Sequence, residues 1–116
     1  MYSLLQVNII ITADHGMAEI TRSIILQEHG ITNDDILVVT TGPNLQAYFN
    51  PKVREDAVWN KLQAVSGWKL YRKQDIPDRF HYRDNARIPP ILAIADEGIE
   101  IVSANNSIMW WWIDDR

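Results

Sequence analysis

Short apolar runs, separated by turn-forming residues, recur along the chain. Residues 7–12, with the sequence Val-Asn-Ile-Ile-Ile-Thr, are mostly apolar and β-branched, which predicts a central strand buried on both faces. Similar runs predict further strands at residues 36–40, 45–49, 68–71, 90–95 and 99–102. Asp96, Glu97 and Gly98 separate the last two runs, and a three-residue link that ends in Gly predicts a β-hairpin there.

Helical spacing is clearest at residues 52–66, where apolar residues recur on one face and Gly67 ends the pattern. Residues 19–28 predict a shorter helix that is ended by Gly30. Residues 74–87 are polar, irregular and dense in charge, which predicts a loop. Together these elements predict an α/β fold, with a mixed sheet and flanking helices.

Composition excludes several classes of function. The chain has 116 residues, enough for one small domain, and 47% of them are hydrophobic, as in ordinary globular proteins. Its formal net charge of -4 gives no sign of a basic surface for nucleic acid. Without Cys, it can form neither disulfides nor thiolate metal sites. No targeting segment is visible, and no apolar run reaches the roughly 18–20 residues of a membrane helix.

Asp14 and His15 directly follow the first predicted strand and precede Gly16. In α/β sheets, ligands bind beyond the carboxyl ends of the strands, and a carboxylate beside an imidazole offers the mixture of donors that zinc accepts. The alternative interpretation is purely structural: Asp14 caps a following helix, and His15 has no role. The pair also supplies only two of the about four ligands that zinc needs, so the others must come from elsewhere.

A second charged region surrounds His81. Arg79, Arg83 and Arg87 are candidates for a phosphate-binding cluster. The same loop contains several Asp residues, however, and a solvated network of ion pairs is the favoured interpretation. His81 itself is assigned a surface or packing role. The chain has neither the Gly-x-Ser-x-Gly motif of a serine hydrolase nor a glycine-rich phosphate loop.

Two stretches of the sequence carry a family resemblance. Ala-Asp-His-Gly-Met at residues 13–17 resembles the Ser-Asp-His-Gly-Met motif of the ectonucleotide pyrophosphatase/phosphodiesterase family, which belongs to the alkaline-phosphatase superfamily. Lys-Gln-Asp-Ile-Pro-Asp-Arg-Phe-His-Tyr at residues 73–82, Asn-Ala-Arg-Ile-Pro-Pro-Ile at residues 85–91 and Ala-Asp-Glu-Gly at residues 95–98 resemble the late part of its catalytic domain. The motifs follow the family's order, and the resemblance covers about residues 5–102.

The resemblance implies a two-zinc hydrolase of phosphodiester or pyrophosphate bonds, which acts on nucleotides or related small molecules outside the cell or at its surface. In such enzymes a threonine nucleophile attacks phosphorus, and an Asp-His pair ligates one zinc ion. Asp14 and His15 match that pair and are the predicted metal ligands. No residue of this chain matches the nucleophile, and no substrate-binding residue is predicted.

The chain also departs from the family pattern. Ala13 stands in place of Ser, and residues 103–116 contain no His where the family has a His-Gly-Tyr-Asp-Asn segment that supplies another ligand. We therefore expect residues 1–102 to form a partial phosphodiesterase catalytic domain, with an incomplete alkaline-phosphatase-like fold, and residues 103–116 to form a divergent tail. Such a chain is expected to be catalytically inactive alone. The alternative is a non-enzymatic pseudoenzyme or binding fragment that keeps part of the fold.

Overall fold

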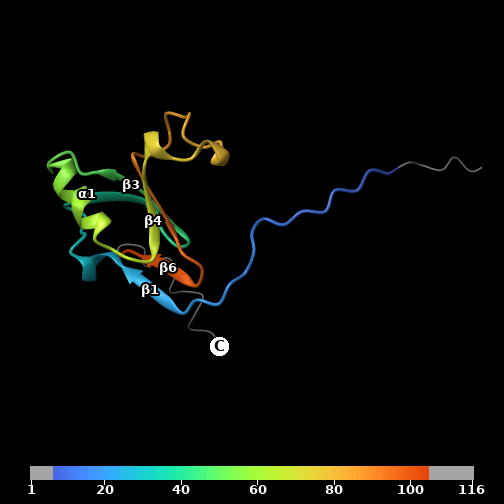
Figure 1. The fold of residues 1–116 in the computed structure, drawn as a ribbon, viewed down its shortest axis with the longest axis horizontal. Helices are drawn as coiled ribbons and strands as arrows, with labels where there is room; N and C mark the ends of the chain where they lie inside the picture. Colours follow the sequence, from blue (N-terminus) through green and yellow to red (C-terminus); the bar gives the residue numbers. More distant parts are fainter. Residues whose placement is uncertain (1–6, 105–116) are drawn as a thin grey trace, which may run out of the picture.

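The computed structural model describes residues 7–104, which form two β-sheets and one α-helix (Figure 1). The larger sheet is antiparallel, with the strand order β2-β3-β5-β4. Its strands are β2 (Ile36–Thr40), β3 (Asn44–Phe49), β4 (Trp68–Arg72) and β5 (Ile91–Ala95). The smaller sheet pairs β1 (Arg22–Ile25) in parallel with β6 (Ile99–Val102).

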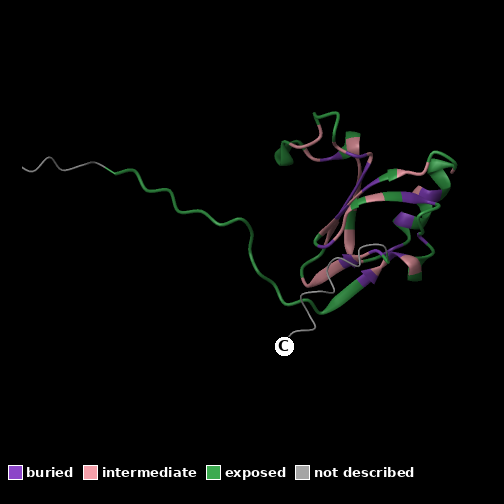
Figure 2. Ribbon diagram, turned by 180° about the vertical axis from the view of Figure 1, so that it is seen from behind, coloured by how far each residue is buried: buried purple, intermediate pink, exposed green. Residues whose placement is uncertain are grey.

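One apolar core joins both sheets to helix α1 (Glu55–Gln63). Its members come from the helix and from both sheets, and include Val58, Leu62, Leu45, Ala47, Ile24 and Ile101. Side chains alternate along β3, so Leu45 and Ala47 enter the core while Gln46 and Tyr48 lie on the opposite face. Figure 2 shows buried residues on α1 and on strands of both sheets.

Most elements predicted from the sequence are confirmed. Each strand predicted after residue 30 forms, within one residue of its expected bounds. Helix α1 forms but is three residues shorter at each end than residues 52–66. The loop predicted at residues 74–87 overlaps the 3-10 helix η2 (Lys73–Asp75) and contains the 3-10 helix η3 (Asp78–Phe80). The α/β class with mixed strand pairing is confirmed, whereas the tail boundary stays a prediction, because residues 105–116 lie outside the described range.

The prediction of a buried central strand at residues 7–12 is wrong. Residues 7–20 are extended but pair with no strand within the described range, and Figure 1 shows their first part leading away from the sheets. Ile10 is 89% exposed and Ile11 is 93% exposed. A strand buried on both faces needs hydrogen-bonded neighbours and a covering layer on each face. Residues 7–104 provide neither, so the apolar segment stays in solvent.

The helix predicted at residues 19–28 is also wrong. These residues form β1 and then the 3-10 helix η1 (Leu26–His29). Pairing with β6 sets Ile24 opposite Ile101, and both side chains are buried. The burial of this pair outweighs a weak local helical pattern. Gly30 does end η1, as expected, with the left-handed φ of 68°.

Strands β5 and β6 do not form the predicted hairpin. The turn itself is present, because the Ile99 N–H donates to the Asp96 carbonyl oxygen at 3.1 Å and Gly98 has a φ of 77°. After the turn, β6 leaves the larger sheet and pairs with β1. Ile101 also exchanges two backbone hydrogen bonds with Gly42. The turn residues therefore fix the reversal of the chain, while distant contacts select the partner of β6.

Candidate functional site

Asp14 and His15, the predicted metal ligands, lie side by side on the extended N-terminal segment. His15 Nε2 is 3.3 Å from Asp14 Oδ2, and the His15 backbone N–H donates to Asp14 Oδ1 at 2.9 Å. Both side chains are exposed, Asp14 by 85% and His15 by 69%. The next element along the chain is a strand, β1, so the interpretation of Asp14 as a helix cap is wrong.

The backbone after the pair orients the imidazole ring. His15 Nδ1 lies 2.8 Å from the Gly16 carbonyl oxygen, and we assign the proton to Nδ1 from this contact. In this tautomer Nε2 is the nitrogen with the lone pair, and it lies 3.3 Å from Asp14 Oδ2. A cation placed between the two side chains would therefore meet one nitrogen donor and one oxygen donor.

The chemistry of these donors fits zinc, but their number does not. Zinc takes about four ligands in structural sites, and about three protein ligands in catalytic sites. Within residues 7–104, no group of three or more His, Asp or Glu side chains is placed to hold a metal ion. Asp14 and His15 therefore supply two ligands, and the described residues do not complete a zinc site.

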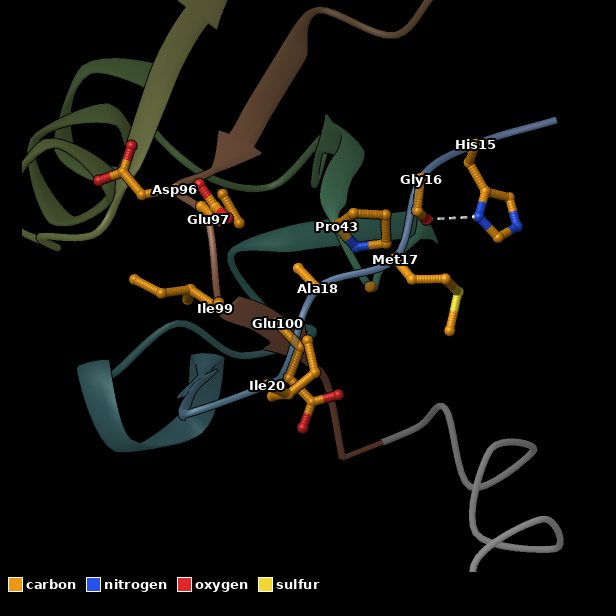
Figure 3. A pocket seen from close by; sticks show the side chains of 13 residues that line it. His15, Gly16, Met17, Ala18, Ile20, Pro43, Asp96, Glu97, Ile99 and Glu100 are labelled. Atoms are coloured by element: carbon orange, nitrogen blue, oxygen red, sulfur yellow. Dashed lines mark hydrogen bonds between the residues drawn. The ribbon is translucent and has the colours of Figure 1, made fainter. Parts of the chain in front are cut away.

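A groove lies beside the pair, between residues 15–20 and the turn that joins β5 to β6 (Figure 3). Its volume is about 520 Å³. Figure 3 shows His15 on one side of this groove and the acidic residues Asp96 and Glu97 on the other. From the sequence, Asp96 and Glu97 were interpreted only as residues of a hairpin turn. That prediction gave β6 no contact with the N-terminal segment, so it did not place these side chains beside His15.

Gly98 holds the two walls of the groove together. Its carbonyl oxygen accepts from the Thr21 backbone N–H at 2.8 Å and from Thr21 Oγ1 at 3.2 Å. A Cβ atom at this position would lie 3.1 Å from Thr21 Oγ1 and 3.2 Å from the Glu19 carbonyl oxygen. Gly98 thus combines a left-handed backbone with a close approach to the N-terminal segment, and both conditions favour glycine.

The charged loop predicted around His81 is held mainly by contacts among its own residues. Arg83 forms ion pairs with Asp78 and, at 3.9 Å, with Asp84. The guanidinium group of Arg79 instead lies over the ring of Phe80, 4.9 Å from its centroid. The network of ion pairs is therefore confirmed for Arg83, whereas Arg79 makes an aromatic contact that the sequence did not reveal.

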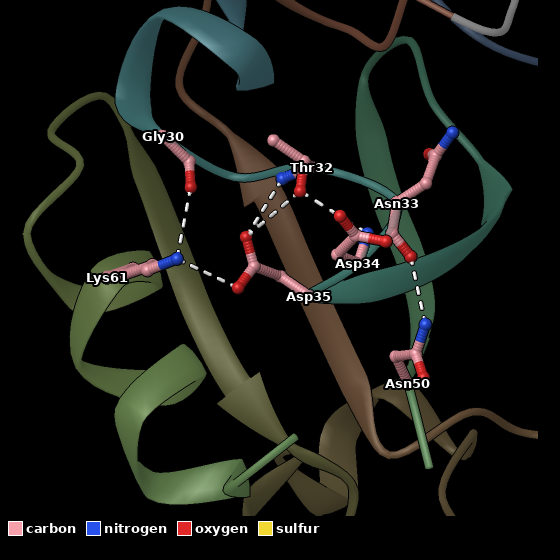
Figure 4. A network of polar contacts seen from close by, with 7 residues as sticks. All are labelled: Gly30, Thr32, Asn33, Asp34, Asp35, Asn50 and Lys61. Carbon is pink, nitrogen blue, oxygen red and sulfur yellow. Dashed lines mark hydrogen bonds and ion pairs between the residues drawn. The ribbon is translucent and has the colours of Figure 1, made fainter. Parts of the chain in front are cut away.

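A second charged cluster, away from the groove, joins Asp35 to Lys61 (Figure 4). Lys61 Nζ donates to Asp35 Oδ1 at 2.8 Å and to the Gly30 carbonyl oxygen at 3.2 Å. The Thr32 backbone N–H donates to Asp35 Oδ2 at 3.0 Å. Burial acts to raise the pKa of Asp35, but the hydrogen bonds from Lys61 and Thr32 outweigh it, and this pKa lies below its usual value. The cluster ties α1 to the connection between η1 and β2.

Comparisons with known proteins agree with the resemblance seen in the sequence. Residues 4–108 match the family described as type I phosphodiesterase / nucleotide pyrophosphatase. This chain belongs to that family. Human bis(5'-adenosyl)-triphosphatase ENPP4 is 37% identical to it over 102 residues, which cover 86% of this chain and 22% of ENPP4. Human ectonucleotide pyrophosphatase/phosphodiesterase family member 5 is 34% identical over 97 residues, covering 82% of this chain and 20% of that protein.

Solved structures of related proteins contain the fold of this chain as part of a larger fold. Murine ENPP5 matches it with a TM-score of 0.71 and 31% identity, over 78% of this chain and 25% of ENPP5. An inactive murine ENPP5 in complex with AMP matches with a TM-score of 0.69 and 32% identity, over 77% of this chain and 24% of that one. The chain thus spans about a fifth of the length of its curated relatives. Within residues 7–104, no helix is long and apolar enough to cross a membrane.

Proposed function

We propose that Asp14 and His15 of this chain are two ligands of a zinc ion in an enzyme that hydrolyses phosphodiester or pyrophosphate bonds of nucleotides. The observation that carries this proposal is the 3.3 Å separation between His15 Nε2 and Asp14 Oδ2, beside a groove of about 520 Å³. Membership of the type I phosphodiesterase / nucleotide pyrophosphatase family supports the reaction class.

Each residue of the pair has a separate role in this proposal. Asp14 offers a carboxylate oxygen, which lowers the net charge of the bound ion. His15 offers Nε2, while the Gly16 carbonyl oxygen holds Nδ1–H and so fixes the tautomer and the direction of the ring. When bound, zinc would polarise a phosphoryl oxygen of the substrate and activate a nucleophile.

The proposed substrate is a nucleotide or a related small phosphodiester. An inactive ENPP5 relative has been solved in complex with AMP, and ENPP4 is described as a bis(5'-adenosyl)-triphosphatase. The ENPP5 relatives are named ectonucleotide pyrophosphatase/phosphodiesterases, so we place the activity outside the cell or at its surface. The complete domain would hold two zinc ions, as the family resemblance implies.

We further propose that the chain by itself does not turn over substrate. Two ligands hold zinc weakly, and no residue matches the threonine nucleophile of the family. The absence of a third metal donor within residues 7–104 favours a second candidate, a pseudoenzyme or binding fragment that retains part of the fold. The two candidates differ in whether zinc binds at Asp14 and His15 at all.

Zinc titration by calorimetry tests the ligand assignment. The wild-type chain is compared with the Asp14→Ala/His15→Ala double variant and with a matched control, Asp34→Ala/His29→Ala, which removes one exposed Asp and one exposed His elsewhere. We expect the first variant to bind zinc at least about tenfold more weakly than wild type. The control should bind like wild type.

The same preparations test catalysis with a chromogenic phosphodiester. We expect no zinc-dependent turnover by the wild-type chain, because the nucleophile has no counterpart in it. Turnover that is lost in the Asp14→Ala/His15→Ala variant would show that the chain is active alone. Zinc binding that is equal in wild type and in that variant would refute the ligand assignment and leave the binding-fragment interpretation.

A further inference from the structure

Residues 76–85, in the connection between β4 and β5, form a compact unit that we call the strap; Figure 1 shows it at the top, in yellow and orange. Arg83 ties its two ends together, because Arg83 Nη1 donates to the Ile76 carbonyl oxygen at 2.9 Å. The base of the connection is closed as well, since the Lys73 backbone N–H donates to the Pro90 carbonyl oxygen at 3.0 Å. A surface loop with close ends and internal contacts of this kind can move as a unit.

Two buried side chains, Ile76 and Leu92, lie outside the apolar core that joins the sheets to α1. Ile76 belongs to the strap and is 0% exposed, whereas Leu92 belongs to β5 and is 5% exposed. Leu92 lies opposite Gln46 of β3 and Tyr71 of β4, so these three side chains share one face of the larger sheet. Because Gln46 lies on the face away from the core, Leu92 must be covered by another part of the chain.

The strap contacts both neighbours of Leu92. The Tyr82 hydroxyl donates to Gln46 Oε1 at 2.8 Å, and this hydrogen bond is partly buried. On the other side, the ring of Phe80 meets the ring of Tyr71 edge to face, with the centroids 6.3 Å apart. The strap therefore spans the strands on both sides of Leu92, and its contacts account for the burial of that side chain.

We propose that the strap detaches from the larger sheet as one unit while the strands stay paired, and that the Tyr82 hydroxyl is its latch. The helix within the strap, η3, is a single 3-10 turn, which is not stable without tertiary contacts. His81, with a φ of 47°, has a left-handed backbone, which a residue other than glycine keeps only where neighbouring contacts hold it. Detachment relieves this strain and uncovers Leu92 and Gln46, while α1 and the main core are unchanged.

Hydrogen exchange of the full 116-residue chain, followed by NMR, measures the detachment. The Phe80 N–H donates to the Pro77 carbonyl oxygen at 3.0 Å, and the His81 N–H donates to the Asp78 carbonyl oxygen at 2.9 Å. Both amides are therefore protected only while η3 is formed. We expect them to exchange at least about tenfold faster than the slowest amides of β3 and β5, after correction for their intrinsic rates.

Lys61→Ala separates detachment of the strap from unfolding of the whole domain. It removes the ion pair between α1 and Asp35, which stays intact when the strap detaches. The substitution should accelerate the slowest amides of β3 and β5 about fivefold, because these exchange through global unfolding, and should leave the Phe80 and His81 amides unchanged. Equal acceleration of the strap and strand amides would overturn the proposal, since the strap would then open only with the whole domain.

Tyr82→Phe tests the latch. It keeps the ring and removes only the hydroxyl, so the Phe80 and His81 amides should exchange about fivefold faster than in wild type. Tyr48→Phe is the matched control, because it removes the same hydroxyl from a tyrosine that is 41% exposed on the same strand face as Gln46. The control should change the two rates by less than about twofold. If both substitutions had the same effect on the strap, the role of Tyr82 as its latch would be wrong.

Discussion

Asp35 connects α1 to the segment that leads into β2 through its ion pair with Lys61. Its carboxylate accepts hydrogen bonds from Lys61 Nζ at 2.8 Å and from the Thr32 backbone N–H at 3.0 Å, and Asp35 as a whole is 8% exposed. Asp35→Ala removes both acceptors at once. The substitution leaves the Thr32 N–H without its partner, and leaves Lys61 of α1 in contact with the connection that leads into β2 only through the Gly30 carbonyl oxygen (Figure 4).

The expected loss of stability depends on how well water can hydrate each donor after the substitution. Loss of the partly buried bond to the Thr32 N–H costs about 1.5–2 kcal/mol, because its acceptor is charged. The Lys61 side chain is 45% exposed, so its ammonium group rehydrates and loss of the ion pair adds only about 1 kcal/mol. We therefore expect Asp35→Ala to lower the free energy of unfolding by about 3 kcal/mol, a large part of the stability of a small domain.

Urea unfolding, followed by circular dichroism, measures this difference. For a slope of about 1.5 kcal/mol per molar urea, the midpoint should fall by about 2 M. Lys61→Ala should cost about 1 kcal/mol, since the carboxylate keeps the Thr32 hydrogen bond. Asp34→Ala is the matched control, because Asp34 is an exposed neighbour of the same charge, and should change stability by less than about 0.5 kcal/mol. Equal effects of Asp34→Ala and Asp35→Ala would refute the reasoning.

Two further predictions concern pH and a close backbone approach. The pKa of Asp35 is lowered in the folded state. The ionised carboxylate therefore contributes its full stabilisation above its unfolded pKa of about 4, and this stabilisation is lost as the pH falls through the folded pKa. We expect the difference in unfolding free energy between wild type and Asp35→Asn to narrow below about pH 4. Gly67→Ala should cost about 2 kcal/mol in urea unfolding, because φ is 101° and a Cβ atom would lie 2.8 Å from Ile99 Cδ1. Gly30→Ala, at φ 68° with no atom within 4 Å, should cost about 1 kcal/mol from backbone strain alone.

Local signals in the sequence were sufficient to locate the four strands of the larger sheet. The strand Ile36–Thr40 ends just before Gly42 and Pro43, and β3 ends before Asn50 and Pro51. Turn residues of this kind limit the apolar runs on both sides, so the strand bounds follow from neighbouring residues alone. The same holds for the centre of α1, whose buried residues recur at helical spacing.

The smaller sheet could not be predicted in this way, because its two strands are far apart in the chain. Ser23 Oγ donates to Glu100 Oε1 at 2.7 Å across 77 positions, and Ile24 lies opposite Ile101 at the same separation. A local pattern of four residues cannot identify such a partner. Two predictions were wrong for this reason: the helix at residues 19–28 and the hairpin at the β5–β6 turn. Each was made from one strand of the pair, β1 or β6, without knowledge of the other strand.

The candidate donors of the site could be named from the sequence, whereas their surroundings could not, and residues 7–15 explain why. Donor identity is a property of single residues, so the sequence alone could single out Asp14 and His15 as candidate ligands, whose nearest side-chain atoms lie 3.3 Å apart. The position of a ligand at the end of a strand depends instead on the neighbours that hold the strand. Residues 7–12 have no such neighbour in the described range, and Asp14 and His15, which follow them directly, are correspondingly exposed. A strand pairing at residues 7–12 would fix the backbone of this segment. A complete metal site at Asp14 and His15 needs the same fixed backbone, because these residues follow the segment directly.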